Sequence, residues 1–286
     1  MNIVEMKNIK VKYKSENKNF MLDIDEFNLE QGIITGLIGK NAKGKTTLIN
    51  ALLDLIKFDE GKVLVFGKSY EKDEIYIRER IGVNYNTISL EIKLKNMVKI
   101  VKRCYKSWDE KYYRELLEKF NLDESQSLRK MSQGTRKLVE IILELSKRPE
   151  LIILDEPTVH LDPVMREEIL KELKSYVYDN EKTLLIVSHI MSDIEMIADY
   201  LYVLKDGQVS LGDYKDNIVS NKILVKGELS FLIDEVRDLF IDIKTNSYGF
   251  EAITDNYEKI FELLGNEVIY EKPSFEKLMI ALMEER

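Results

Sequence analysis

The chain has 286 residues, of which 44% are hydrophobic and 33% are charged. These proportions are typical of a globular protein with one large domain and room for a small second one. The net charge of −8 argues against a broad nucleic-acid-binding surface, and the single cysteine, Cys104, fits a reducing compartment. No apolar run approaches the roughly 20 residues that span a bilayer, and the N-terminus does not resemble a signal peptide. We therefore expect any connection with a membrane to come through a partner.

Residues 3–29 alternate apolar and polar side chains along much of their length. This pattern predicts two or three half-buried strands and no helix. Tyr13 lies near the end of the first of them. Its position alone favours an ordinary surface aromatic over a ring that stacks on a base.

A candidate phosphate-binding loop follows at residues 39–47, with the sequence Gly-Lys-Asn-Ala-Lys-Gly-Lys-Thr-Thr. It lies between an apolar run at 33–38 and a helical pattern that begins at about residue 48, which is the context this spacing requires. Successive N–H groups there can wrap a polyphosphate, and the helix dipole favours the negative charge. Lys45 would reach the β- and γ-phosphates, and the Thr46 hydroxyl would ligate Mg²⁺. The alternative is a glycine-rich turn that binds nothing.

The next segments predict a strand at 61–67, a helix at about 71–79 and a strand at 81–85. Helical patterns then dominate from about 92 to 146. Ser107 and Glu110 have the spacing of a capping box, with Ser107 at the N-cap and Glu110 at N3. Because this helical block interrupts an α/β chain, we expect it to form a subdomain over about residues 87–146.

A further helix opens at Ser132, Gln133 and Gly134, and its first turn is a second candidate anion site. Taken alone, a simple serine N-cap is the better interpretation.

The apolar run at 151–154 ends in two carboxylates, Asp155 and Glu156. Unbroken apolar character predicts a strand that is buried on both faces, as in a parallel sheet. Buried acids are costly unless they meet a metal or a partner, which favours a functional role for this pair. Asp155 would hold Mg²⁺ through water, and Glu156 would orient and polarise the attacking water.

Another buried strand is predicted at 183–188, after a turn at 157–163 and a helix at about 163–179. His189 follows this strand directly. A lone histidine there is usually structural, but parallel strands would place it at the same sheet edge as Lys45 and Glu156, which favours a γ-phosphate contact. A hairpin with an Asp-Gly turn is expected at 201–209.

The register changes from about residue 216. Strands are expected at 223–225 and 267–270, and helices at about 228–239, 256–264 and 274–285. This segment carries no nucleotide motif. We expect residues 216–286 to form a small α+β accessory or regulatory domain.

Together, the phosphate loop, the Ser-x-Gly helix start, the Asp-Glu strand, the Leu-Asp turn and the strand followed by histidine occur in an order that resembles the ATP-binding subunit of an ABC transporter, over about residues 1–215. The resemblance implies an α/β P-loop NTPase fold. Its RecA-like parallel sheet would carry an antiparallel β-subdomain and the inserted helical subdomain. It also implies an ATPase with ATP and Mg²⁺ as cofactors.

The resemblance assigns roles to individual residues. Tyr13 would stack on adenine, Asp155 and Glu156 would be the metal acid and the catalytic base, and His189 would be the switch histidine. Asn86 stands where the family has a metal-sensing glutamine, so the implied metal set is Thr46, Asn86 and Asp155. Asp162, after Leu161, would lie in the turn that crosses to the other subunit. The remaining implied ATP contacts are Gly39, Lys40, Asn41, Ala42, Lys43, Gly44, Lys45, Thr46, Thr47, Ser132, Gln133 and Gly134.

The chain departs from the family pattern in several places. Ala42-Lys43 replaces the usual Gly-Ala or Gly-Ser, although an alanine in the α region still allows the loop to wrap. Gln133-Gly134-Thr135 replaces Gly-Gly-Gln, Asn86 is one methylene shorter than glutamine, and His160 stands where a small residue is common. Such variants resemble bacterial exporter-like members that pair with a separately encoded permease.

Ser132-Gln133-Gly134 stands where the family has its signature, Leu-Ser-Gly-Gly-Gln, so the helix that opens there corresponds to the signature helix. In that family two copies close head to tail, with each ATP between the phosphate loop of one and the signature helix of the other. The implied partners are therefore a second ATPase subunit, identical or different, and an integral-membrane permease, without nucleic acid. The protein would be peripheral at the cytoplasmic face of the membrane. The alternatives are a soluble ABC-type ATPase, or a nucleotide-dependent regulatory subunit with weak hydrolysis. The presence of Glu156 and His189 argues against the second alternative.

Overall fold

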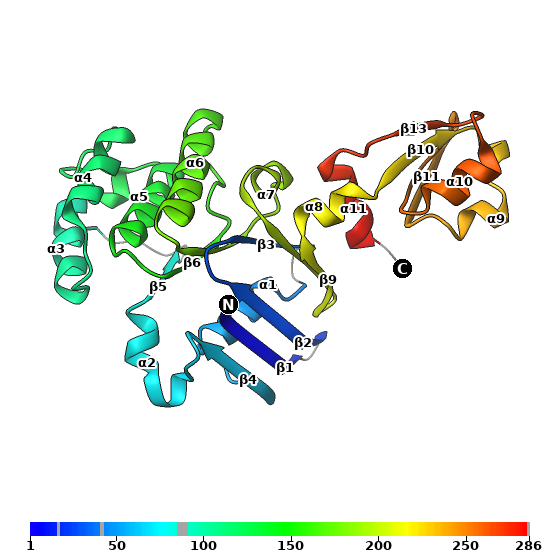
Figure 1. The fold of residues 1–286 in the computed structure, drawn as a ribbon. Helices are drawn as coiled ribbons and strands as arrows, with labels where there is room; N and C mark the ends of the chain where they lie inside the picture. The colour runs from blue at the N-terminus through cyan, green and yellow to red at the C-terminus, as the bar shows by residue number, and fades with distance from the viewer. Residues whose placement is uncertain (16–17, 41–42, 85–90, 285–286) are drawn as a thin grey trace.

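The computed structural model describes residues 1–15, 18–40, 43–84 and 91–284. Figure 1 shows a larger region that contains a central sheet, a group of helices and an antiparallel sheet, and a smaller lobe near the C-terminus. Helices α8 (Lys215–Ser220) and α11 (Phe275–Glu284) lie between the two. Within the described ranges, every helix is too short or too polar to cross a bilayer.

The central sheet has six strands in the order β5-β6-β7-β3-β8-β9, and every pairing is parallel except that of β8 with β9. This arrangement confirms the predicted parallel core. Because parallel strands share a direction, the carboxyl ends of β3, β6 and β7 meet at one edge. The strands are β3 (Ile34–Gly39), β5 (Ile81–Asn84), β6 (Leu151–Asp155), β7 (Thr183–Val187), β8 (Tyr200–Lys205) and β9 (Gln208–Tyr214).

Successive residues of the central strands belong to two different hydrophobic cores, one on each face of the sheet. Ile152 and Leu154 pack into the core formed with the helical block. Leu151 and Ile153 pack into the core shared with the antiparallel strands. A strand covered on both faces needs apolar residues at every position, which explains the unbroken run in the sequence.

The antiparallel sheet has the order β2-β1-β4, formed by β1 (Asn2–Ser15), β2 (Lys18–Glu30) and β4 (Glu60–Val65). The expected strands at 3–29 are therefore two long ones. The alternating pattern arises because one face is buried against the helix α1 (Lys45–Leu52), whose Leu48 and Leu52 lie in the same core as Met6 and Ile24.

The helical block contains α3 (Leu94–Cys104), α4 (Glu110–Lys119) and α5 (Gln133–Ser146), and α2 (Tyr70–Arg78) precedes it. The predicted capping box is wrong. Asp109 is the N-cap of α4 and accepts from Tyr112 N at 3.0 Å. Ser107 Oγ donates to the Lys147 carbonyl at 2.6 Å instead. Aspartate caps as well as serine, so the helix begins two residues later than the box requires.

The smaller lobe is a four-stranded antiparallel sheet in the order β11-β12-β10-β13. Two of its strands, β11 (Asp242–Asn246) and β12 (Gly249–Thr254), were not predicted. The helix expected at 228–239 is wrong: a 3₁₀ turn at Leu229–Phe231 and the four-residue α9 (Asp234–Arg237) stand there. The other elements, β10 (Ile223–Gly227), α10 (Tyr257–Leu264) and β13 (Ile269–Glu271), follow the prediction closely.

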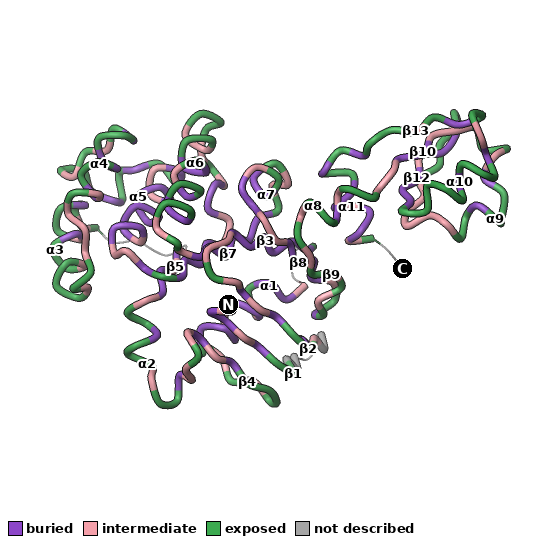
Figure 2. Tube along the Cα trace, viewed as in Figure 1, coloured by how far each residue is buried: buried purple, intermediate pink, exposed green. Residues whose placement is uncertain are grey.

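The lobe has its own hydrophobic core, which includes Val225, Phe250 and Ile260. Helix α11 does not belong to it. Leu278 and Met279 of α11 are fully buried in the core of the larger region, together with Leu224 and Ile253 from the outer face of the lobe's sheet. Buried positions on α11 are visible in Figure 2. The last helix therefore packs against α7 (Met191–Ile197) and β8 and joins the two regions.

Candidate functional site

The phosphate loop connects β3 to α1. Gly44 is the N-cap of α1 at φ 109° and makes no side-chain capping bond. The positive φ favours glycine there, and a Cβ at Gly44 would lie 2.8 Å from Phe20 Cζ, so that the Phe20 ring would have to shift. The first-turn N–H groups of α1 have no side-chain acceptor at this N-cap, which is the arrangement that binds a phosphate.

Lys45 is buried at the start of α1, and its Nζ donates to the carbonyls of Gly39 at 2.6 Å and Lys40 at 3.2 Å. Burial lowers the pKa of Lys45, whereas the charges of Glu156 and Asp155 raise it. The sheet thus brings the loop lysine within electrostatic reach of both acids. Thr46, next to it, is exposed.

Asp155 is the last residue of β6. Its N–H donates to Asn84 Oδ1 at 2.9 Å, and its carbonyl accepts from Lys137 Nζ at 3.0 Å. Burial raises the pKa of the Asp155 carboxyl, and the neighbouring Glu156 raises it further, while Lys137 and Lys45 lower it. A half-buried carboxylate with a raised pKa is suited to a cation that would replace its lost hydration.

Glu156 and His189 meet where β6 and β7 end. His189 Nδ1 lies 2.7 Å from Glu156 Oε2, and the His189 N–H donates to Glu156 Oε1 at 3.1 Å. Glu156 adopts φ 49°, which is unusual for a residue with a side chain, and its own N–H donates to the Val187 carbonyl at 2.8 Å. The carboxylate is therefore held by both the backbone and the ring of His189.

The Ser132 helix start is capped as the simpler interpretation expects. Ser132 Oγ accepts from Thr135 N at 3.0 Å. A Cβ at Gly134 would lie 2.3 Å from the His160 carbonyl, so this helix can approach the turn before α6 (Pro163–Asp179) only through glycine. Asp162 is the N-cap of α6 and accepts from Val164 N and Met165 N.

Several expected site residues lie outside the described residues, namely Asn41, Ala42 and Asn86, as does the side chain of Tyr13. Of the other loop lysines, Lys43 pairs with Asp206 of the β8–β9 hairpin, and Lys40 Nζ lies 3.6 Å from Glu284 of α11. Gly39 ends β3, Thr47 is the third residue of α1, and the exposed Gln133 is the first residue of α5.

Asn84 and Lys137 both contact Asp155, but neither was among the site residues expected from the sequence. A signal was present. Lys137 lies on the same face of α5 as Ile141, one turn away, where a lysine is out of place, and Asn84 closes an otherwise apolar strand.

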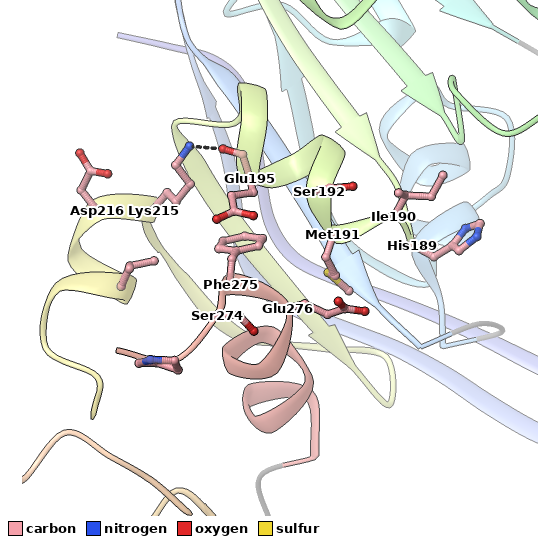
Figure 3. Close-up of a pocket in the computed structure, with 12 residues that line it drawn as sticks. His189, Ile190, Met191, Ser192, Glu195, Lys215, Asp216, Ser274, Phe275 and Glu276 are labelled. Atoms are coloured by element: carbon pink, nitrogen blue, oxygen red, sulfur yellow. Dashed lines mark hydrogen bonds between the residues drawn. The ribbon is translucent and has the colours of Figure 1, made fainter. Parts of the chain in front are cut away.

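A cavity of about 640 Å³ lies beside His189, between α7, α8 and the beginning of α11. Figure 3 shows His189 at one end of it and Lys215 and Asp216 at the other, with Phe275 between them. Lys45, Asp155 and Glu156 do not line this cavity, so it is distinct from the phosphate loop. A second hollow of about 250 Å³ lies where the end of α11 meets Lys40 and Lys43.

Known proteins show the same organisation. The sequence profile of the ABC transporter family matches residues 22–159. The chain is 28% identical over 234 residues to the ABC transporter ATP-binding protein YtrB of Bacillus subtilis, covering 78% of each chain. It is 30% identical to the methionine import ATP-binding protein MetN 1 of Oenococcus oeni, with 95% of this chain and 78% of that protein covered.

A solved structure of an ATP-binding subunit of an ABC transporter superposes with a TM-score of 0.67 at 24% identity, covering 76% of this chain and 92% of the other. That likeness supports the fold, and the sequence matches support the family. The chain belongs to the ATP-binding subunits of ABC transporters and is an ATPase.

Proposed function

We propose that Lys45, Asp155, Glu156 and His189 form the hydrolytic site of this ATPase, and that the protein powers transport through a separate permease. The observation that carries the proposal is the convergence of these groups at one edge of the parallel sheet. Glu156 and His189 are in direct contact, and Lys45 lies within electrostatic reach of both acids. An acid, a base partner and a phosphate-binding lysine in one place are the elements that phosphoryl transfer to water requires.

The site fits Mg·ATP. The uncapped N-terminus of α1 and the buried Lys45 suit a triphosphate, and the raised pKa of Asp155 suits a divalent cation. Bound Mg·ATP supplies the γ-phosphoryl group and a metal charge that neutralises its oxygens. We assign Thr46, Asp155 and Asn86 to the metal, and the loop from Gly39 to Thr47, with Tyr13, to the nucleotide.

Each residue of the chain then has a distinct task. Lys45 neutralises phosphate charge and fixes the end of the triphosphate in place. Glu156 holds the attacking water and accepts its proton. His189 keeps the Glu156 carboxylate in position through the two contacts described above, and we expect it to face the γ-phosphate.

A second subunit completes the site. The chain has one phosphate loop and one Ser132-Gln133-Gly134 helix start, so two copies, identical or not, would each lend the helix start and the Asp162 turn to the other's ATP. Closure and reopening would reach the permease through the helical subdomain, about residues 87–146.

We place the ATPase domain at residues 1–215 and the accessory domain at 216–286, peripheral at the cytoplasmic face of the membrane. We propose export as the direction, because the altered loop and signature resemble exporter-like members. Transport by vesicles that contain this chain and its permease tests the direction. Movement of the substrate across the membrane away from the side that carries the ATPase supports export, and movement toward that side indicates import.

The variant Glu156→Gln tests the hydrolytic site. It should bind ATP as the wild type does but hydrolyse it at least about 100-fold more slowly, because the amide cannot accept the proton. Glu258→Gln, an exposed acid on α10, is the matched control and should hydrolyse ATP normally. Wild-type hydrolysis by Glu156→Gln would refute the assignment.

Two further measurements test the assembly. Glu156→Gln should sediment as a dimer with saturating Mg·ATP, and a monomer under those conditions would contradict the two-subunit site. Recovery of an integral-membrane protein with the tagged chain from detergent extracts would support the transporter subunit. Its absence would contradict the proposed separate permease.

A further inference from the structure

We propose that Asn84 and Lys137 are positioning residues that hold the Asp155–Glu156 turn by the backbone of Asp155, so that helix α5 sets the catalytic carboxylates of its own subunit. This inference rests on the proposed roles of Asp155 and Glu156. It adds two residues to the site and a mechanical link between the signature helix and hydrolysis.

Both backbone polar groups of Asp155 are bound by side chains. The N–H and the carbonyl of one strand residue point the same way, and those of Asp155 point toward β5. Asn84, the last described residue on β5, pairs in register with Leu154, the residue before Asp155. Asn84 Oδ1 accepts the Asp155 N–H at 2.9 Å, and Lys137 Nζ donates to the Asp155 carbonyl at 3.0 Å. Two side chains thus bond to both backbone polar groups of Asp155.

Asn84 and Lys137 are both buried, which is costly for polar side chains. Lys137 has only 8% of its surface exposed and Asn84 only 3%. A buried ammonium loses hydration, and an apolar residue of similar volume at such a position is often as stable or more so. The charges of Glu140, Asp155 and Glu156 act favourably on Lys137. We infer that the lysine serves the acids at the strand end, since packing alone does not require it.

The next residue needs such support. Glu156 adopts φ 49°, a conformation that side chains disfavour and that persists only when the surrounding structure holds it. On one side its N–H is bound to Val187 of β7, and on the other Asp155 is held by Asn84 and Lys137. Release of the Asp155 backbone would let the turn relax and move the Glu156 carboxylate away from its water.

The two positioning residues lie on the elements that come before and at the end of the helical block in the sequence. Asn84 is on β5, the strand that precedes the block, and Lys137 is on α5, the helix that precedes β6. Lys137 lies four residues after Gln133, about one turn along the same rigid helix that begins with the signature. A shift of α5, driven by the partner's nucleotide or by the permease, would therefore reach Asp155 directly.

The variant Lys137→Met tests the proposal, because it removes the donor and keeps the length and apolar volume. We expect kcat to fall roughly 10- to 100-fold, the effect of a displaced catalytic group, while KM and the dissociation constant for ATP stay within about twofold. Lys137→Arg should restore most of kcat, because its guanidinium can donate to the same carbonyl. Asn84→Leu, which leaves the Asp155 N–H without its acceptor, should also lower kcat with little change in KM.

Lys171→Met is the matched control, an exposed lysine on α6 whose replacement should change neither constant. Should Lys137→Met fail to fold, as judged by its thermal transition, Lys137→Leu, which also lacks a donor, takes its place with the same expectation. In the Glu156→Gln background, Lys137→Met should add little further loss, since both act on the same step.

The outcomes separate the two proposals. Wild-type kcat in Lys137→Met or Lys137→Leu, together with an inactive Glu156→Gln, refutes the positioning role and leaves the hydrolytic site intact. An active Glu156→Gln refutes the hydrolytic site itself. A parallel fall of ATP affinity and kcat in Lys137→Met would indicate a merely structural lysine and refute the proposal.

Discussion

Of the three sheets in the described residues, the central sheet and the sheet of the smaller lobe use their strand ends differently. In the parallel sheet the ends of β3, β6 and β7 meet at one edge, and Lys45, Glu156 and His189 follow those ends. In the antiparallel sheet of the smaller lobe, neighbouring strands end on opposite sides, and its charges pair across strands, as Lys226 does with Glu271 at 2.6 Å. Parallel topology concentrates reactive groups, and antiparallel topology disperses and neutralises them.

The two regions meet at α11. Along the chain, α11 follows the smaller lobe. Its buried side chains nevertheless belong to the core of the larger region. The smaller lobe keeps a separate core. We therefore expect a destabilising substitution in α11 to lower the stability of the larger region, which carries the ATPase site. A destabilising substitution in the lobe's own core should affect the lobe alone.

The largest effect should come from removing the lysine at the edge of the central sheet, compared with removing a lysine from the sheet of the smaller lobe. Lys45→Ala should lower ATP hydrolysis about 10²- to 10³-fold, the range for loss of one charge-stabilising group, and should weaken ATP binding. Lys226→Ala removes the same charge from the antiparallel sheet of the smaller lobe, and its rate of ATP hydrolysis should stay within about twofold of the wild type. Steady-state hydrolysis with isothermal titration of ATP measures both, and equal losses would erase the distinction between the sheets.

Leu278→Ala tests α11. Leu278 is fully buried in the core of the larger region, so the truncation should cost about 2–5 kcal/mol of unfolding free energy. Leu263→Ala on α10, where 46% of the side chain is exposed, should change stability by no more than about 0.5 kcal/mol. Urea denaturation followed by tryptophan fluorescence gives both values. A negligible effect of Leu278→Ala would mean that α11 is not part of that core in solution.

Ile260→Ala tests the independence of the smaller lobe. Ile260 is fully buried in the lobe's own core, so its loss should destabilise that lobe by a similar amount, while kcat at 25 °C stays near the wild-type value. Hydrogen exchange resolved by peptide would show faster exchange in β10 and β12 and unchanged exchange in β6 and β7. Equal acceleration in all four strands would show one cooperative unit.

The smallest effect should come from Glu284→Gln. The Lys40–Glu284 pair is 3.6 Å apart, and both side chains are largely exposed, at 54% and 42%. Exposed pairs of this kind contribute about 0.2–1 kcal/mol at most, so we expect KM for ATP to change less than about threefold. Thermal shift and KM measurements at low and high salt would check this. A tenfold change in KM would instead make the end of α11 a regulator of the phosphate loop.

The sequence alone determined the parts of the site that depend on local spacing. The glycine pattern before α1, the apolar strand ending in Asp155 and Glu156, and the histidine after β7 are each readable because a loop or a buried strand restricts its residues strongly. Their order along the chain indicated the parallel sheet and the family. Strand β11 escaped detection because an exposed edge strand made of Asp-Ile-Lys-Thr-Asn carries almost no apolar signal.

The tertiary structure decided what depends on distant partners. Asn84 and Lys137 lie 71 and 18 residues from Asp155, and only the packing of α5 and β5 on β6 brings them to its backbone. Asp109, and not Ser107, is the N-cap of α4, while the Ser107 hydroxyl donates to the distant Lys147 carbonyl. The amphipathic pattern of α11 predicted a helix but not its position, because any apolar surface can bury such a face. Local spacing specifies the reactive groups, and long-range packing specifies what holds them in place.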